Sequence, residues 1–265
     1  MTVTAVHHLN CGTMCPFAGR LLGFPRLVAH VLVLETVRDG LVLVDTGFGA
    51  DECARTRRLP GGFVLVGAQL DPAEPAIAQL AALGFQPADV RHIAVTHLDA
   101  DHAGGLSDFP KATVHVHARE HAAAHARATR VERARYHPPQ WAHGVSWAVY
   151  TEDGETWRGL PAIAKLRGLD ADIGLVPMHG HTRGHSAVIA RHGDTWLVHA
   201  GDAYFHRREV ADPPGRVPGA LRGYEKLMAM DKPAMRASQA ALRQLKLSYP
   251  DIRMFCAHDP EELVA

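Results

Sequence analysis

The stretch from Val95 to Gly105, which reads Val-Thr-His-Leu-Asp-Ala-Asp-His-Ala-Gly-Gly, constrains this chain more than any other part of it. It continues an apolar run from Ile93 that predicts a short buried strand. Two imidazoles and two carboxylates then follow within six residues, where a turn can aim them at one point. Imidazole combined with carboxylate suits Zn, Fe or Mn, whereas an all-oxygen set suits Mg or Ca. Taken alone, the stretch also fits a polar loop with capping Asp and solvated His residues.

Three later apolar runs also end on potential metal ligands. The run from Ile173 to Met178 is followed by a Gly-His-Thr-Arg-Gly-His-Ser segment that contains His185. A second run leads to Asp202, and a third leads to His258. A sheet that delivers its ligands from one edge is an architecture typical of metal sites. The candidate ligands are His97, Asp99, Asp101, His102, His185, Asp202 and His258.

In order and spacing, these seven residues resemble the ligand series of the metallo-β-lactamase superfamily. The resemblance covers the chain from about Val31 to His258. It implies an α/β fold, a four-layer αββα sandwich with the metals at one edge of its two sheets. We therefore expect one domain over residues 1–265. The usual first motif of the family is His-x-His-x-Asp-His, and this chain has a His-x-Asp-x-Asp-His variant because Asp99 replaces the second His.

The resemblance further implies two divalent metal ions, with Zn as the first expectation and Fe or Mn as alternatives. It assigns His97, Asp99 and His185 to metal 1, Asp101, His102 and His258 to metal 2, and Asp202 as the bridge between the metals. It also implies that Asp45, in an Asp-Thr-Gly turn, orients ligands from outside the coordination sphere.

Asp99 changes the expected charge of this centre. Three ligand carboxylates and one hydroxide would balance two divalent ions, whereas a His at position 99 would leave one positive charge. A neutral centre should acidify bound water less, and the added oxygen makes Fe or Mn more plausible beside Zn. A hydrogen bond from outside the coordination sphere is the competing role for Asp99.

These features predict a hydrolase of a carboxylic ester or lactone, in which a metal-bridging hydroxide attacks the carbonyl. The chain has no Gly-x-Ser-x-Gly motif, so little supports a serine hydrolase. Asp101 is a candidate to pass a proton to the leaving group. In related lactonases a Tyr three residues after the bridging Asp faces the substrate; here Phe205 holds that place, and Tyr204 could replace it only in an irregular loop.

Three other functions remain open at this stage, of which a metal-bound scaffold or sensor without turnover has the least support. Asp99 favours a diiron redox or oxygen-handling protein, since the flavodiiron branch of the superfamily has a carboxylate in this place. Arg207 and Arg208 favour a second alternative, a thioesterase of the hydroxyacylglutathione hydrolase type, because basic residues hold glutathione in that family.

The composition limits the partners and the compartment. The 265 residues include 28 basic and 28 acidic side chains, which argues against a nucleic-acid partner held by charge. No apolar stretch approaches the ~20 residues that cross a bilayer, and no signal peptide is visible. The four cysteines, too sparse for a disulfide scaffold, suggest free thiols in a reducing cytoplasm. We expect a small-molecule substrate and no membrane partner.

The segment from about residue 118 to 160 is longer than the family fold needs. We interpret it as an insertion that forms a lid or a pocket wall. Its helical part is expected from Ala118 to Arg135, and its aromatic residues equally suit a contact in a homodimer.

Overall fold

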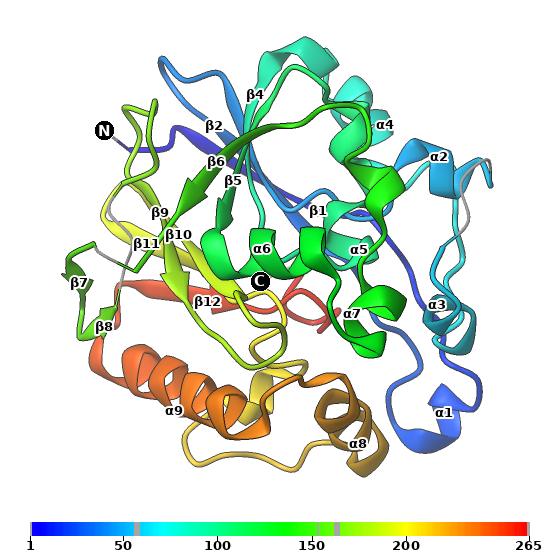
Figure 1. Cartoon of the computed structure of the whole chain (residues 1–265). Coiled ribbons are helices and arrows are strands. Elements are labelled where there is room, and N and C mark those ends of the chain that lie inside the picture. The colour runs from blue at the N-terminus through cyan, green and yellow to red at the C-terminus, as the bar shows by residue number, and fades with distance from the viewer. Residues whose placement is uncertain (1, 56–58, 153, 162–164, 264–265) are drawn as a thin grey trace.

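The computed structural model describes residues 2–55, 59–152, 154–161 and 165–263, whose strands form two large sheets (Figure 1). The six-stranded sheet has the order β1-β2-β3-β4-β5-β6, antiparallel up to β3 and parallel from β3 onward. Its strands are β1 (Ala5–Asn10), β2 (His30–Glu35), β3 (Leu41–Val44), β4 (Val90–Ala94), β5 (Thr113–His117) and β6 (Ser146–Tyr150). The four-stranded sheet has the order β12-β11-β10-β9. Its strands are β9 (Ile173–Pro177), β10 (Ser186–His192), β11 (Thr195–His199) and β12 (Ile252–Phe255), and β7 (Thr156–Trp157) pairs separately with β8 (Leu160–Pro161).

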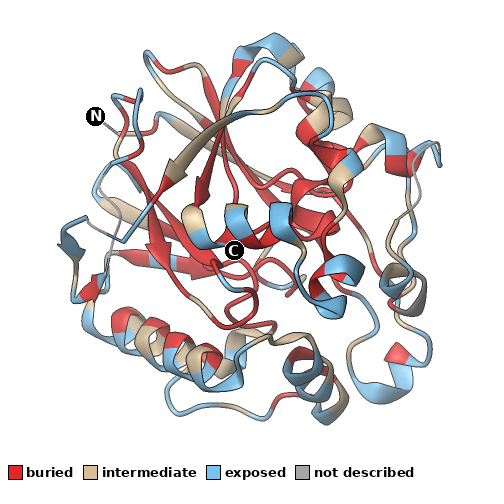
Figure 2. Ribbon diagram, viewed as in Figure 1, coloured by how far each residue is buried: buried red, intermediate tan, exposed pale blue. Residues whose placement is uncertain are grey.

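Alternation along the strands builds separate cores on the two faces of each sheet. Val31 and Val33 of β2 pack into a core with helices on the outer face, whereas Leu32 and Leu34 pack between the two sheets. Figure 2 shows most strands of both sheets buried, whereas the edge strands β1 and β6 are mostly of intermediate exposure. Burial of each such side chain contributes about 1.5–3 kcal/mol, so both cores favour this packing.

Helices cover the outer faces of both sheets. Leu80 of α4 (Ala76–Ala82) and Ala124 of α6 (Ala118–Ala126) belong to the outer core of the six-stranded sheet. Leu242 and Leu245 of α9 (Lys232–Ser248) pack on the outer face of the four-stranded sheet. The layers therefore run helix, sheet, sheet, helix, which confirms the predicted αββα sandwich (Figure 1).

The remaining helices are short and lie mostly in the connections. They are α1 (Gly19–Leu22), α2 (Ala50–Cys53), α3 (Gly62–Leu65), α5 (Ala100–Ala103), α7 (Arg130–Arg135), α8 (Gly219–Met228) and the 3₁₀ turns η1 (Pro87–Asp89), η2 (Gly104–Asp108), η3 (Pro138–Gln140) and η4 (Arg207–Glu209). Among the described residues, no helix is long and apolar enough to cross a membrane.

The segment proposed as a lid divides into two parts. Helices α6 and α7 replace the single helical stretch expected up to residue 135, because Arg127 adopts a left-handed conformation with φ 44° and ends α6. Ser146–Tyr150 forms β6, which pairs with β5 in the six-stranded sheet. The predicted insertion at about 118–160 therefore contains a strand of the six-stranded sheet as well as helices, and residue 153 within it lies outside the described residues.

Strand direction places the candidate ligands together. Strands β3, β4 and β5 run parallel in one sheet, and β9, β11 and β12 share one direction in the other. The loops that follow β4, β9, β11 and β12 carry the potential ligands, so the carboxyl ends of these strands bring them to a common edge.

Candidate metal centre

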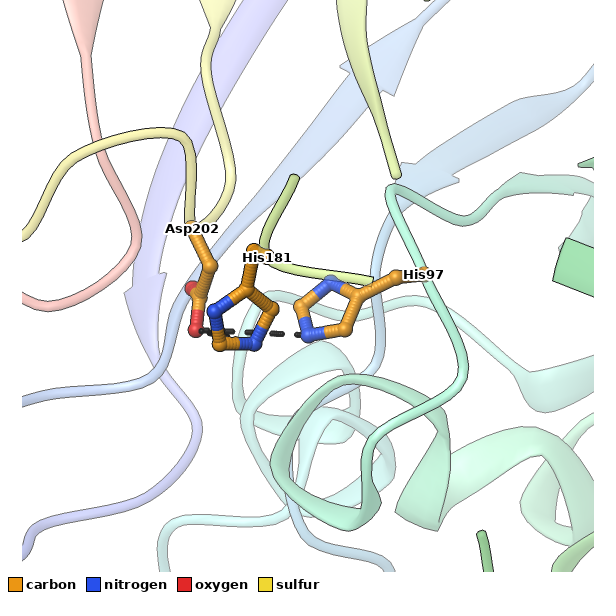
Figure 3. A group of neighbouring side chains, drawn as sticks. All are labelled: His97, His181 and Asp202. Carbon is orange, nitrogen blue, oxygen red and sulfur yellow. Dashed lines mark ion pairs between the residues drawn. The ribbon is translucent and has the colours of Figure 1, made fainter. Parts of the chain in front are cut away.

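Four side chains from three separate loops form the first group, and Figure 3 shows three of them. His97 Nε2 lies 3.4 Å from Asp99 Oδ2, and His181 Nε2 lies 3.1 Å from the same oxygen. Asp202 Oδ2 is 3.3 Å from His181 Nε2 and 4.0 Å from His97 Nε2. The ring nitrogens and carboxylate oxygens thus enclose one point.

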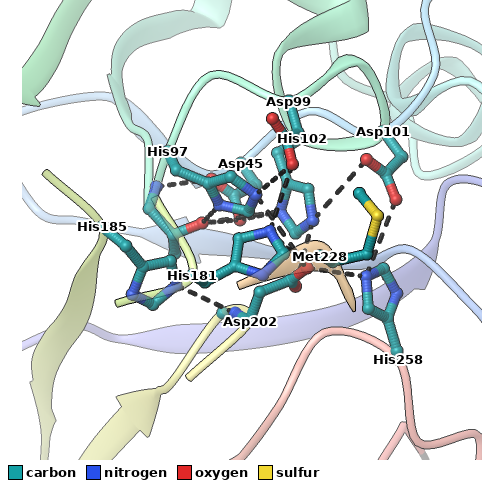
Figure 4. A network of polar contacts seen from close by, with 12 residues as sticks. Asp45, His97, Asp99, Asp101, His102, His181, His185, Asp202, Met228 and His258 are labelled. Carbon is teal, nitrogen blue, oxygen red and sulfur yellow. Dashed lines mark hydrogen bonds and ion pairs between the residues drawn. The ribbon is translucent and has the colours of Figure 1, made fainter. Parts of the chain in front are cut away.

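Asp202 also takes part in the second group (Figure 4). Its Oδ1 lies 3.2 Å from His102 Nε2, and its Oδ2 lies 3.1 Å from His258 Nε2. Asp101 completes the group at longer range, 3.6 Å from His258 and 3.9 Å from His102. Asp202 therefore faces both groups with one carboxylate, as a bridging ligand must.

The donor atoms fit two divalent cations. Ligands at about 2.1 Å from a tetrahedral ion stand roughly 3.4 Å apart, close to most of the observed separations. Three of these atoms are buried without a hydrogen-bond partner: His97 Nε2, His102 Nε2 and Asp202 Oδ1. Buried polar atoms without partners are rare, and a cation between these groups would satisfy most of them.

His181 occupies the place that the sequence assigned to His185. Both ring nitrogens of His185 are already used, since Nδ1 donates to Met178 O at 2.8 Å and Nε2 accepts from Asp202 N at 2.9 Å. The structure brings the other six predicted ligands together but gives His185 a backbone-bracing position. The signal for His181 was present, because the Gly-His pair occurs twice in this segment.

Gly180 explains how His181 reaches the centre. Its φ is +134°, and a Cβ at this position would lie 2.2 Å from Met235 N at the start of α9. Only Gly allows this approach without strain. The tight contact holds the loop so that His181 faces Asp99 and Asp202.

Hydrogen bonds on the far side of the rings orient them. Asp45, itself at φ 59°, accepts from His102 Nδ1 at 2.8 Å and from Thr96 N at 2.7 Å. His258 Nδ1 donates to Val28 O at 2.7 Å. A proton on Nδ1 leaves the lone pair of Nε2 free to face the centre, which is how outer partners prepare a metal-binding His. The orienting role expected for Asp45 agrees with these contacts.

Helices α6 and α7 brace the ligand loops. Buried Glu120 of α6 accepts from Leu98 N at 3.0 Å and from Gly184 N at 3.1 Å, which ties the first ligand segment to the second. Arg135 of α7 lies 3.4 Å from Asp99 through Nε and donates to His181 O at 2.7 Å. The sequence reasoning missed both residues, because nothing in their spacing links them to the motifs.

Charge and burial shift the acidities of the cluster in opposite directions. Burial alone would raise the pKa of Asp99, but Arg135 and His97 hold it well below its ordinary value. Burial raises the pKa of Asp101, and the neighbouring carboxylates add to that rise. Burial would lower the pKa of His102, yet the surrounding carboxylates, led by Asp202, raise it well above its ordinary value. The surplus of negative charge favours cation binding.

Tyr204 is not brought to the centre. Its hydroxyl is fully buried and donates to Glu262 at 3.1 Å, and its ring packs in the core beneath α9. Phe205 points the other way, with its ring centroid 4.9 Å from that of His258 and 5.8 Å from that of His181. Neighbours in this segment thus face opposite sides.

A different tyrosine approaches from α8. The Tyr224 ring lies 6.0 Å from that of Phe205. Burial raises the pKa of Tyr224, and the charges of Asp101 and Asp202 raise it further. Met228, one turn later on α8, lies beside the second group in Figure 4. A cavity of about 210 Å³ that reaches His258 is lined by apolar and polar side chains, among them Phe24, Leu27, Phe205, Arg207 and Leu221.

Comparison with known proteins gives the family. The model of the metallo-β-lactamase superfamily matches residues 25–258. The chain is 45% identical over 262 residues to a probable metallo-hydrolase of Mycobacterium tuberculosis, which covers 97% of this chain and 80% of that protein. The chain therefore belongs to the metallo-β-lactamase superfamily and is a metal-dependent hydrolase, as its motifs predicted; the fold implies divalent metal ions.

Lactonases stand among the more distant relatives. An N-acyl homoserine lactonase of Rhizobium johnstonii is 29% identical over 168 residues, 60% of this chain and 58% of that one. A solved N-acyl homoserine lactone hydrolase with N-hexanoyl-L-homoserine at its catalytic metal centre has a TM-score of 0.71 at 21% identity and covers 99% of this chain and 96% of that chain. The dizinc quorum-quenching lactonase AidC has a TM-score of 0.61 at 16% identity, over 98% of this chain and 90% of that chain. At such identities these two structures support the fold.

Proposed function

We propose that this chain hydrolyses a carboxylic ester, with lactones as the first substrate class to test, at a centre of two divalent metal ions. The observation that carries the proposal is Asp202, whose carboxylate faces a His97–Asp99–His181 group and an Asp101–His102–His258 group. The named lactonases among its relatives support the substrate class.

When bound, two divalent ions supply Lewis acidity toward a carbonyl oxygen and a nucleophile derived from water at neutral pH. The chain contributes the positions of the ligands. His102 and His258 keep their Nε2 atoms toward the centre through the bonds of their Nδ1 atoms to Asp45 and Val28. Zn is the expected metal because imidazole and carboxylate ligands in a tetrahedral arrangement suit it.

Asp101 is the proposed proton carrier. Both of its oxygens stand farther from their nearest ring nitrogens, 3.6 and 3.9 Å, than the Asp202 oxygens do. A loosely held carboxylate beside the centre can pass a proton to the leaving oxygen. The ring of Phe205 lies 4.9 Å from that of His258, and Met228 lies beside the second group (Figure 4), so apolar side chains border this side of the centre.

Arg207 offers little support for a glutathione thioester as substrate. Its guanidinium donates to Asp259 at 2.8 and 2.9 Å, so it is already paired. A diiron redox protein remains the second candidate, favoured by the carboxylate at position 99 close to His97 and His181.

The deciding experiment is an activity panel on protein purified without added metal. Lactones, simple esters, thioesters, β-lactams and phosphodiesters are assayed beside elemental analysis and an absorption spectrum. We expect about two divalent ions per chain and the highest kcat/KM on a lactone or ester. Redox-active iron without esterase or lactonase turnover would refute the proposal in favour of the redox protein.

The state of the cysteines supports a reducing compartment. All four cysteines are free, and Cys11, Cys53 and Cys256 are buried. Free buried thiols are typical of proteins that work in the cytoplasm, which is the location we propose.

A further inference from the structure

Arg135 is a buried cation that touches three parts of the active site at once. Its Nε lies 3.4 Å from Asp99 Oδ1, and its two terminal nitrogens donate to His181 O at 2.7 Å and to Met228 O at 2.5 Å. These acceptors belong to the first ligand loop, the second ligand loop and the last residue of α8. Only 8% of the residue surface is exposed.

The geometry of these contacts requires an arginine. A guanidinium offers five donors in a rigid planar fork, whereas the ammonium of Lys is a compact group with three donors. No other described side chain reaches both Asp99 and the backbone of His181. Because a buried cation is stable only when it is paired and hydrogen-bonded, Asp99 and Arg135 depend on each other.

The positive charge of Arg135 lies beside the negative charge that Asp99 introduces in place of the usual His of the family motif. Asp99 turns Oδ2 toward His97 and His181 and leaves Oδ1 toward Arg135. Each oxygen therefore faces a different positive group once a cation is bound beside Oδ2. A neutral imidazole at position 99 would give the guanidinium no anion, and the buried positive charge would repel the metal.

We propose that Arg135 is a positioning residue for metal 1, which holds the Asp99 carboxylate and the His181 loop in place and balances the charge that Asp99 adds. The insertion thereby works as an electrostatic brace of the metal site. This inference rests on the proposed two-metal function. It makes Asp99 and Arg135 a matched pair, so that changing one alters the effect of changing the other.

The test is a double-mutant cycle read by metal binding instead of turnover. Apoprotein is titrated with Co²⁺ in the wild type, Arg135→Met, Asp99→His and the double variant, and affinities and visible spectra are recorded. Arg133→Met is the matched control, because Arg133 lies on the same helix and is exposed. Circular dichroism and thermal melting report folding of each variant.

We expect Arg135→Met to weaken Co²⁺ binding at one of the two sites, that of metal 1, by about 10–100-fold, which is the range for partners outside the coordination sphere. The spectrum of that site should change while the other site is retained, and Arg133→Met should match the wild type. Asp99→His should bind Co²⁺ at least about tenfold better with Met at position 135 than with Arg there. Arg135→Lys, which keeps the charge with less disturbance, should recover part of the affinity and is the variant to use if Arg135→Met does not fold.

Two results separate this inference from the function on which it rests. A wild-type protein that binds fewer than two Co²⁺ ions would refute the proposed centre and this role together. Two ions bound normally by Arg135→Met and Arg135→Lys, or strictly additive effects in the cycle, would refute the role of Arg135 alone.

Discussion

Replacing each histidine of the Gly-His-Thr-Arg-Gly-His segment in turn by Ala should separate an effect on metal binding from an effect on the stability of the fold. His181 offers Nε2 to Asp99 and Asp202 at 3.1 and 3.3 Å, whereas His185 uses both nitrogens for backbone bonds. His181→Ala should therefore release one metal, and His185→Ala should weaken the fold.

The magnitudes follow from what each ring does. Loss of His185 leaves Asp202 N and Met178 O buried without partners, and each such group costs about 1–3 kcal/mol. The sum of about 2–6 kcal/mol corresponds to a fall in Tm of roughly 5–20 °C for a chain of this size. Loss of His181 removes a proposed ligand, so metal affinity should fall by more than the ~100-fold that outer partners reach.

The assay is thermal melting of both apoproteins together with metal analysis after dialysis. We expect His181→Ala to melt within a few degrees of the wild type but to retain about one metal per chain. His185→Ala should melt far lower yet still bind two metals when folded. If His185→Ala keeps its Tm and loses a metal while His181→Ala keeps both, the assignment of His181 is wrong.

Three further changes test separate contacts. Tyr224→Phe should lower kcat about 10-fold with metal content unchanged, as expected for the loss of one donor to a developing oxyanion. Tyr204→Phe should leave kcat unchanged and lower the stability of the fold by about 1 kcal/mol, because its hydrogen bond to a buried carboxylate is lost. Equal kcat values for the two variants would exclude a catalytic role for Tyr224. Asp45→Asn should weaken metal binding by about 10–100-fold, measured with a competing chelator, and unchanged affinity would contradict its orienting role. Burial and then Glu209 raise the pKa of Glu225 from 4.5 to about 9, so the folded state keeps a proton that the unfolded state loses, and stability should fall by about 2 kcal/mol between pH 7 and 9. Glu225→Gln should abolish this fall in denaturation measured against pH, and the same pH dependence in the variant and the wild type would show that Glu225 is not the titrating group.

Local sequence determined much of this protein. Alternation in runs such as Leu32–Leu34 decides which side chains face each core, because successive residues of a strand point to opposite sides. The His97–His102 turn needs only one strand end to gather its ligands. Asp202 and His258 follow strands in the same manner, so their place at one edge was predictable.

Tertiary structure decided what lies between these motifs. His181 and His185 have the same local pattern, and only the approach of Gly180 to α9 and the bond from Asp202 N to His185 distinguish them. Tyr204 faces a core because the packing under α9 fixes the side to which its strand exit turns.

Arg135 shows most clearly that local sequence does not predict contacts between distant segments. It stands 36 residues beyond Asp99 along the chain, on a helix with no motif, and only the fold brings its guanidinium to the carboxylate. Periodicity reports which face of an element is buried, but a contact between distant segments depends on how whole elements pack. For that reason the sequence determined the candidate ligand types and the edge where they meet, whereas the tertiary structure decided which histidine faces the other ligands and which cation lies beside Asp99.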